Sequence, residues 1–256
     1  MLAYTPAELQ AFDHDRAPPR SVWKELFPWR LWRPARYRRR IVRRVEMSAP
    51  DVNKPTRRSA DRRSMLVGWL NVQSLSPNKI DPVNELVADC SLDVLALSET
   101  WHSSSDDARL RLAMPAGYAI ADAPRAAGRG GGVAVIYRKH LKRSRITLPP
   151  CDMFKALCVR LTSSAGPIVL LNIYRWGSAR LSAKFFDELA SVLEVLVVHA
   201  CPVIAGGDLN IHVHDAEDSD ARRLRDLTST FDIVQHIDQP AHRCGGTLDL
   251  VMTFAD

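Results

Sequence analysis

Short apolar runs separated by turn residues make up most of the chain from Met65 onward, a pattern typical of strands. Seven runs are expected to form strands, at residues 65–72, 93–99, 131–138, 155–161, 167–174, 202–208 and 247–253. Apolar residues at helical spacing, preceded by capping residues, predict three helices at residues 81–90, 182–199 and 220–230. Many short strands with a few interspersed helices indicate an α+β domain in which helices cover packed sheets.

Residues 1–64 differ in composition from the rest. They hold 16 Lys and Arg against 7 Asp and Glu, whereas residues 65–256 hold 19 against 22, so the basic character of the chain lies in the first segment. Its prolines argue against a folded unit, and we expect a basic, disordered tail with a domain boundary near Ser64. Its arginines are interleaved with tryptophan and tyrosine, which is compatible with binding nucleic acid, RNA included, or with a plain solvated charge run.

The composition also limits the class of protein. With 46% hydrophobic and 25% charged residues, the 256-residue chain can bury the core of one globular domain. Five cysteines without a C-x-x-C pair are expected to be reduced thiols of an intracellular protein. No signal-peptide pattern opens the chain, and the most apolar stretch, residues 189–205, is broken by Glu194, His199 and Pro202. A membrane span is therefore not expected.

Polar residues close four of the predicted strands. Asn71 ends the first, Glu99 the second, Tyr174 the fifth, and Asp208, followed by Asn210, the sixth. Taken singly, such residues are more often turn caps, solvated strand ends or Asx turns. Their repetition favours a functional site, because a rigid strand end can hold a side chain in a cleft.

A fifth signal is Asp249, which lies inside the apolar run TLDLVMT. A carboxylate is costly to bury without a partner. We therefore expect Asp249 to have a hydrogen-bonded partner such as a histidine or a metal-bound water.

Together these motifs resemble the endonuclease/exonuclease/phosphatase superfamily. The matching motifs, in order, are Asn71 in the first strand, S-E-T-W, N-I-Y-R, G-G-D-L-N and T-L-D-L-V. The phrases GRGGGVAVIYRKHL and QPAHRCGGTLDLVMT are similar to the apurinic-type endonuclease domain of non-LTR (LINE-type) retrotransposons. The resemblance covers residues 65–256. It implies a four-layered α/β sandwich, with two packed and mostly antiparallel sheets, and a metal-dependent hydrolase that nicks DNA, which in turn implies action in the nucleus.

The resemblance also assigns catalytic roles. Glu99, assisted by Asn71, would bind Mg²⁺ or Mn²⁺, which polarises the scissile phosphate and stabilises the leaving oxygen. Asp208 would position or deprotonate the attacking water. Asn210 and Tyr174 would donate hydrogen bonds to the phosphoryl oxygens.

Further roles concern the substrate and the end of the chain. Arg175, His242 and Arg243 are expected to contact nucleic acid. In the family, Asp249 orients a histidine in a later S-D-H motif. The sequence ends at Asp256, and none of its eight histidines follows a Ser-Asp pair, so we expect missing C-terminal strands and weak or no hydrolysis.

Two other functions remain open at this point. The same fold serves phosphatases and phosphodiesterases that act on small or lipid phosphates. The chain could also be a non-catalytic nucleic-acid binder in which the basic segment supplies the affinity. The sequence motifs that resemble those of retrotransposon endonucleases favour DNA as the substrate.

Overall fold

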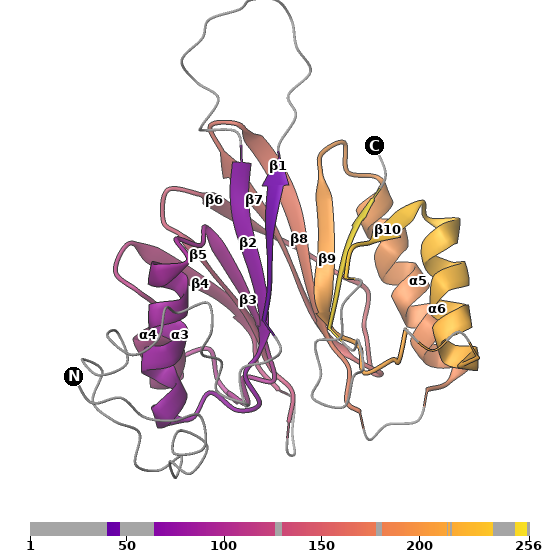
Figure 1. The fold of residues 1–256 in the computed structure, drawn as a ribbon, viewed down its shortest axis with the longest axis horizontal. Helices are drawn as coiled ribbons and strands as arrows, with labels where there is room; N and C mark the ends of the chain where they lie inside the picture. Colours follow the sequence, from indigo (N-terminus) through magenta and orange to yellow (C-terminus); the bar gives the residue numbers. More distant parts are fainter. Residues whose placement is uncertain are drawn as a thin grey trace, which may run out of the picture. The chain divides into compact units, whose positions relative to one another are not determined.

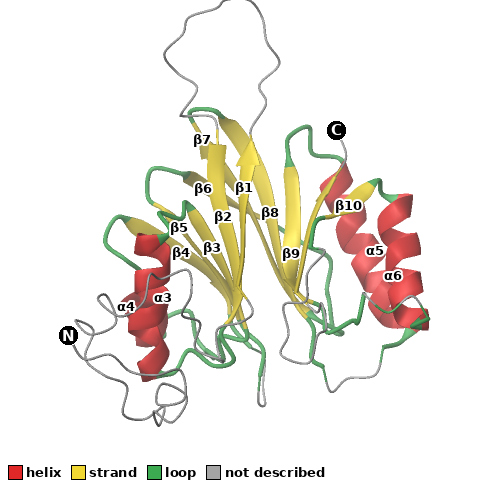
Figure 2. Cartoon of the chain, viewed as in Figure 1, coloured by secondary structure: helices red, strands yellow, loops and turns green. Residues whose placement is uncertain are grey.

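The computed structural model describes residues 40–46, 64–125, 130–177, 181–213, 215, 217–237 and 249–254. These residues form two mixed sheets, which lie between pairs of helices (Figures 1 and 2). The first sheet contains β1 (Arg40–Glu46), β2 (Ser64–Asn71), β3 (Val94–Ser98), β4 (Tyr118–Ala123) and β5 (Val133–Arg138). The second contains β6 (Lys142–Ile146), β7 (Lys155–Ser163), β8 (Gly166–Tyr174), β9 (Val203–Asp208), β10 (Ile233–Gln235) and β11 (Asp249–Phe254).

Each sheet has one parallel pair of neighbouring strands in an otherwise antiparallel arrangement. The order of the first sheet is β1-β2-β3-β5-β4, and its parallel pair is β2 with β3. The order of the second is β10-β11-β9-β8-β7-β6, and its parallel pair is β8 with β9. In a parallel pair both strands end at the same edge of the sheet. Each sheet therefore brings two strand ends together at one place.

The inner faces of the two sheets pack on each other and form one apolar core. Alternate residues of a strand point to opposite faces, and Val94 and Ala96 of β3 lie in this inner core with Leu170 of β8 and Ile204 of β9. The intervening Leu95 and Leu97 are also fully buried, on the outer face of the first sheet. Helices α3 (Pro77–Asp89) and α4 (Ala108–Ala113) cover that side (Figure 2).

A second apolar cluster lies on the outer face of the second sheet, under α5 (Ala183–Val197) and α6 (Ser219–Thr230). The expected apolar face of α5 is buried throughout, at Phe185, Phe186, Leu189, Val192, Leu193 and Leu196. The molecule is thus a four-layered α/β sandwich, as the sequence predicts. Among the described helices, none is long and apolar enough to cross a bilayer.

All predicted elements are present, and one of them has a shifted boundary. Several further elements of the structure were not predicted. The seven predicted strands lie within two residues of their expected bounds, and α5 and α6 begin within one residue of theirs. Helix α3 begins at Pro77 rather than at residue 81, because Ser76 and Pro77 provide an N-cap position and a proline in the first turn. Pro82, expected to start the helix, lies inside it.

Strand β1 corrects the expected boundary near Ser64. It pairs antiparallel with β2, with Arg40 opposite Leu70 and Glu46 opposite Ser64, so the first sheet extends into the basic segment. The compact unit accordingly begins at Arg39. The sequence RIVRRVE gives a weak strand signal because its charged residues outnumber its apolar residues. The expectation of disorder for the rest of the basic segment, residues 1–39 and 47–63, falls outside the described residues.

Candidate active site

The ends of the two parallel strand pairs carry most of the predicted site residues. Asn71 ends β2 and is in register with Ser98, which precedes Glu99 at the end of β3. Tyr174 ends β8 and is in register with Asp208, which ends β9. The two pairs belong to different sheets, so the site forms where the packed sheets meet at one edge.

Asn71 joins the acidic residues of the two sheets. Its amide nitrogen donates to Glu99 Oε1 at 2.7 Å and to Asp208 Oδ2 at 2.6 Å. Its amide oxygen accepts from the backbone N–H of Gln73 at 3.0 Å. Both N–H groups of the amide are therefore engaged by the acids, and its oxygen, which has two lone pairs, accepts one backbone hydrogen bond. Asn71 thus orients the acids, and its role as a metal ligand stays a prediction.

Tyr174 is buried beside the two acids. Burial raises the pKa of its phenol, and the carboxylates of Glu99 and Asp208 and a hydrogen bond to Glu99 act in the same direction. Its ring meets that of Trp176 edge to face, with ring centroids 6.0 Å apart. The phenol is thus kept protonated, which suits a hydrogen-bond donor.

Arg175 has a structural position that differs from the expected nucleic-acid contact. Its side chain is buried, and its guanidinium donates to the carbonyl oxygens of Leu209 (2.6 Å), Asn210 (2.8 Å) and Trp176 (3.0 Å). It also lies over the ring of Phe185. Arg175 thus ties the loop after β9 to the end of β8 and faces the protein interior. Sequence alone could not separate a buried arginine from an exposed one.

Asn210 completes this loop. Its amide nitrogen donates to the carbonyl oxygen of Arg175 at 2.6 Å, and its backbone N–H donates to Asp208 Oδ1 at 3.0 Å. One carboxylate oxygen of Asp208 thus accepts a hydrogen bond from the loop backbone, and the other accepts one from the Asn71 amide. Asp208 is fully buried and held from both sides.

The two glycines before Asp208 lie within β9, inside the strand predicted at residues 202–208. A Cβ on Gly206 would lie 2.6 Å from the indole of Trp69, which packs across from the first sheet. A Cβ on Gly207, where φ is +134°, would overlap the carbonyl oxygen of Ile173. Glycine at both positions lets β9 approach its neighbours closely enough to place Asp208.

Unusual backbone conformations gather around the same strand ends. Among the described residues other than glycine, seven have positive φ, and five of these lie in the site loops: Gln73, Ser74, Glu99, Trp101 and Asn210. Each such conformation costs about 1–3 kcal/mol and is common at functional sites. Glu99 itself has φ +54°. Its carboxylate is therefore aimed by a backbone that the surrounding structure must hold in place.

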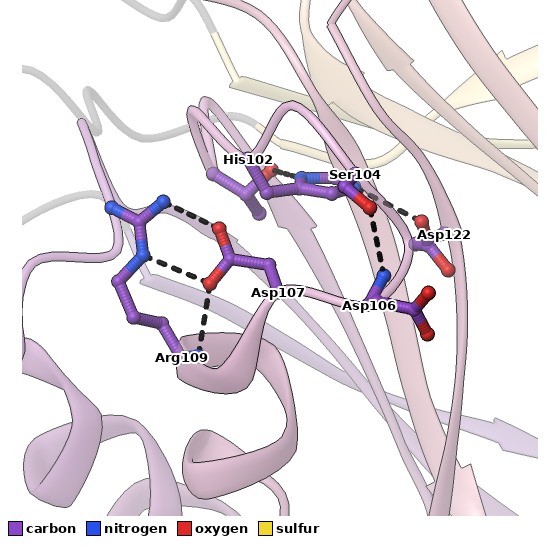
Figure 3. Close-up of polar contacts among 7 residues, drawn as sticks. His102, Ser104, Asp106, Asp107, Arg109 and Asp122 are labelled. Atoms are coloured by element: carbon purple, nitrogen blue, oxygen red, sulfur yellow. Dashed lines mark hydrogen bonds and ion pairs between the residues drawn. The ribbon is translucent and has the colours of Figure 1, made fainter.

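A buried hydrogen-bonded chain next to Glu99 was missed from the sequence. His102 Nδ1 lies 2.6 Å from Thr100 Oγ1, and His102 Nε2 lies 3.1 Å from Asp122 Oδ2 on β4 (Figure 3). A neutral ring with its proton on Nε2 satisfies both contacts. Burial lowers the pKa of His102, while the hydrogen bond and charge of Asp122 act in the opposite direction. Ser105 also donates to Asp122 at 2.7 Å.

The hydrogen bonds of Thr100 and His102 help to hold the segment after Glu99 against the first sheet. The backbone N–H groups of Thr100 and Trp101 donate to the carbonyl oxygens of Gly132 and Gly131. A Cβ on Gly132 would lie 2.6 Å from Thr100 Oγ1, so glycine is needed for this approach. Asp107 then caps α4 by accepting from the backbone of Arg109 (Figure 3). In the sequence, the available sign of these buried hydrogen bonds was the alternation of polar Thr100 and His102 just after Glu99.

The remaining predicted residues lie at the edge of the described ranges or outside them. The backbone of Asp249 begins β11 and is in register with Asp208, which places this residue at the same end of the second sheet. His242 and Arg243 lie outside the described residues.

Comparison with known proteins identifies the domain. A model of the Endonuclease/Exonuclease/phosphatase family matches residues 68–255. The chain belongs to this family. Enzymes of the family are hydrolytic nucleases and phosphatases, and they generally use divalent metal ions. No curated protein matches the sequence.

Solved structures show the same endonuclease/exonuclease/phosphatase fold. An AP endonuclease from Leishmania major is 17% identical over 99% of this chain and 91% of its own, with a TM-score of 0.58. The endonuclease domain of TRAS1, a telomere-specific non-LTR retrotransposon, is 12% identical over 74% of this chain and 85% of its own, with a TM-score of 0.55. The 3′ phosphatase NExo from Neisseria is 20% identical over 73% and 84%, with a TM-score of 0.50.

The acidic residues of this endonuclease/exonuclease/phosphatase site fit a small hard cation. No three His, Cys, Asp or Glu side chains converge within the described ranges, which argues against a site built from protein ligands alone. Mg²⁺ is usually held by one or two carboxylates together with water and substrate phosphate. Glu99 and Asp208, joined by Asn71, supply two carboxylates of this kind.

Proposed function

We propose that this protein hydrolyses phosphodiester bonds of DNA with Mg²⁺ or Mn²⁺, as a nicking endonuclease of the LINE-retrotransposon type. The observation that carries the proposal is the cluster in which Asn71 bridges Glu99 and Asp208 beside Tyr174. The cluster lies at the ends of strands from both sheets. Its buried carboxylate, Asp208, and the neutral phenol of Tyr174 suit the attack of water on a phosphate. The retrotransposon-like motifs around Gly130 and Asp249 support DNA over a small phosphate ester.

Glu99 is the residue best placed to hold the metal, because it is only partly buried and one of its oxygens is fixed by Asn71. A bound Mg²⁺ supplies positive charge that polarises the scissile phosphate and stabilises the leaving oxygen. The two carboxylates face each other through one amide, so their negative charge is concentrated where a cation would bind.

Asp208 is the residue that orients the attacking water and accepts its proton. Its carboxylate cannot rotate freely, since Asn71 holds one oxygen and the backbone of Asn210 the other. Such fixed orientation lowers the barrier by positioning the nucleophile before reaction.

Tyr174 and Asn210 are the donors to the phosphoryl oxygens. The raised pKa of Tyr174 keeps its O–H available for donation. The amide nitrogen of Asn210 uses one N–H for the carbonyl oxygen of Arg175, which leaves the second for a phosphate oxygen. Donors that are fixed in advance stabilise charge that develops in the transition state.

The proposal is tested by nicking of supercoiled plasmid in Mg²⁺, Mn²⁺ or EDTA. We expect metal-dependent nicking that falls by about 10²-fold or more in Glu99→Gln. Glu194→Gln, an exposed change of the same type on α5, serves as the control and should retain activity. Nicking that persists in EDTA, or that is equal in the two variants, would contradict the proposal.

The substrate class is tested on the same preparations. Intact duplex, duplex with an abasic site, 3′-phosphorylated DNA and a small phosphate ester are compared at equal enzyme concentration. Nicking of intact duplex as the fastest reaction supports the proposed endonuclease. Release of phosphate from DNA ends or from the small ester as the fastest reaction would indicate a phosphatase, and DNA binding without any hydrolysis would indicate a non-catalytic binder.

A further inference from the structure

A strongly basic stretch lies outside the candidate site. Between Asp122 and Asp152 the chain contains seven Lys and Arg and no acidic residue. Three of the seven, Lys142, Arg143 and Arg145, lie on β6, where all three side chains are exposed. Strand β6 is an edge strand of the second sheet. Its charge is therefore presented to solvent along the whole strand.

These cations have no acidic partners in the part of the chain that the structure describes. None of Lys142, Arg143 and Arg145 forms an ion pair or a side-chain hydrogen bond there. Nearby basic residues behave differently, since Arg138 pairs with Asp93 and Lys184 pairs with Asp152. The β6 cations therefore keep their charge available for an external anion.

Charge at an edge strand has a common structural explanation, which is protection against edge-to-edge pairing with another molecule. That explanation does not cover Arg160. This residue lies on β7, which has neighbours on both sides, and it is exposed opposite Ser144 of β6. We name Lys142, Arg143, Arg145 and Arg160 the β6 strip.

The β6 strip leads toward the candidate site. Arg145 lines a groove of about 390 Å³ that also contains Lys155 and the apolar side chains of Ile146 and Leu148. Lys155 begins β7 and is in register with Tyr174 at the end of β8. Cations therefore continue from the edge of the second sheet to the strand beside the catalytic tyrosine.

We infer that the β6 strip binds the phosphate backbone of a nucleic-acid strand that also reaches the end of the second sheet where Tyr174 lies. Alternate residues of a strand point to opposite faces, so Arg143 and Arg145, opposite Leu161 and Val159, project to one side of the edge, while Lys142 and Arg160 project to the other. Unpaired cations on both sides of the edge suit a polyanion that lies along it. Binding at the strip requires neither a metal ion nor the Glu99 cluster.

The test compares two triple variants of the full chain that lose the same charge. The first is Lys142→Gln, Arg143→Gln, Arg145→Gln. The control is Arg222→Gln, Arg223→Gln, Arg225→Gln on α6, where three exposed arginines lie on a helix covering the second sheet. Binding of fluorescein-labelled duplex and single-stranded DNA is measured by anisotropy in EDTA, between about 50 and 200 mM salt.

We expect the β6 variant to bind duplex at least about tenfold more weakly than the wild type. The slope of log K against log salt should decrease in magnitude by up to about 2.7, since each lost phosphate contact contributes about 0.9. The α6 variant should change affinity less than about twofold. If nicking then fails in all proteins while these differences hold, hydrolysis is contradicted and the strip is not.

Three results would overturn the inference. Equal losses in the β6 and α6 variants would show that only total charge matters. Unchanged DNA binding with new oligomers of the β6 variant in size-exclusion chromatography would show that the charges protect the edge. Unchanged DNA binding with loss of sedimentation on phosphatidylserine vesicles would assign the strip to a lipid surface.

Discussion

The amide nitrogen of Asn71 is shared between two carboxylates from different sheets, Glu99 Oε1 at 2.7 Å and Asp208 Oδ2 at 2.6 Å. In Asn71→Asp a third carboxylate replaces these two donors, and like charges at this distance repel. Without metal we expect a loss of about 1–3 kcal/mol in the free energy of unfolding, with Mg²⁺ or Mn²⁺ raising Tm more in the variant than in the wild type. Thermal unfolding with and without metal measures both effects, and Asn84→Asp on α3 is the control. Equal metal shifts in the wild type and the variant would argue against a cation at this cluster.

Arg175 allows a direct choice between a structural and a nucleic-acid-binding role. Arg175→Met keeps the apolar stem but leaves the carbonyl oxygens of Leu209 and Asn210 without their donor. We expect the free energy of unfolding to fall by about 3 kcal/mol or more in urea titrations. The salt dependence of DNA binding should not change. A decrease in that slope without a loss of stability would restore the nucleic-acid contact expected from the sequence.

His102 makes stability depend on pH. Because burial lowers its pKa in the folded state below the ordinary value of 6.5, the unfolded chain takes up the proton more readily. The contribution to stability is therefore complete above about pH 6.5 and is lost as pH falls through the lower, folded pKa. Urea unfolding at a series of pH values should show this loss in the wild type and a flatter profile in His102→Asn. The exposed His140→Asn should leave the profile unchanged.

Gly207 and Gly166 form a matched pair for the packing of β9. Both have positive φ, but a Cβ on Gly207 would overlap the carbonyl oxygen of Ile173, whereas a Cβ on Gly166 would meet nothing within 4 Å. Gly166→Ala should cost only the backbone strain of about 1–3 kcal/mol. Gly207→Ala should cost clearly more, by about 3 kcal/mol or enough to prevent folding. Similar losses in the two variants, measured by urea unfolding, would mean that β9 can move away from β8 without penalty.

Tyr174→Phe removes one hydroxyl from the site while keeping the ring against Trp176. On the proposed mechanism kcat for nicking falls by about 10²-fold with little change in KM. Since burial and the neighbouring acids raise the phenol pKa, its ionisation should not limit the wild-type rate below about pH 10. Steady-state rates up to pH 9 test both points. A fall in the wild-type rate near pH 8 that is absent from the variant would assign an ionising phenol to the reaction.

The sequence allowed accurate prediction where hydrophobic patterning and burial agree. Strands β3, β8 and β9 are continuous apolar runs because they are covered on both faces, and α5 has one clear apolar face. The residues at the ends of these strands could therefore be placed at one edge, while their catalytic roles stay predictions. The ordered motifs did more than any single residue, since a strand-end Asn71 or Glu99 has ordinary structural explanations.

What could not be predicted depends on contacts between distant segments. Strand β6 is charged because it lies at an edge, and β4 contains alanines that give a weak strand signal. Whether Arg175 faces the interior, and whether His102 finds Asp122, is decided by packing that no local pattern encodes. The position of the Asn71 amide depends likewise on a partner 137 residues away.

That separation has a consequence for folding. Asn71 and Glu99 come from the first sheet, while Tyr174 and Asp208 come from the second, which is synthesised later. Neither sheet alone contains both acids, so a nascent chain with only its first sheet complete has half of the cluster. On the proposed function, capacity to cleave DNA should therefore appear only when the sheets dock, and a chain arrested before docking should leave DNA intact.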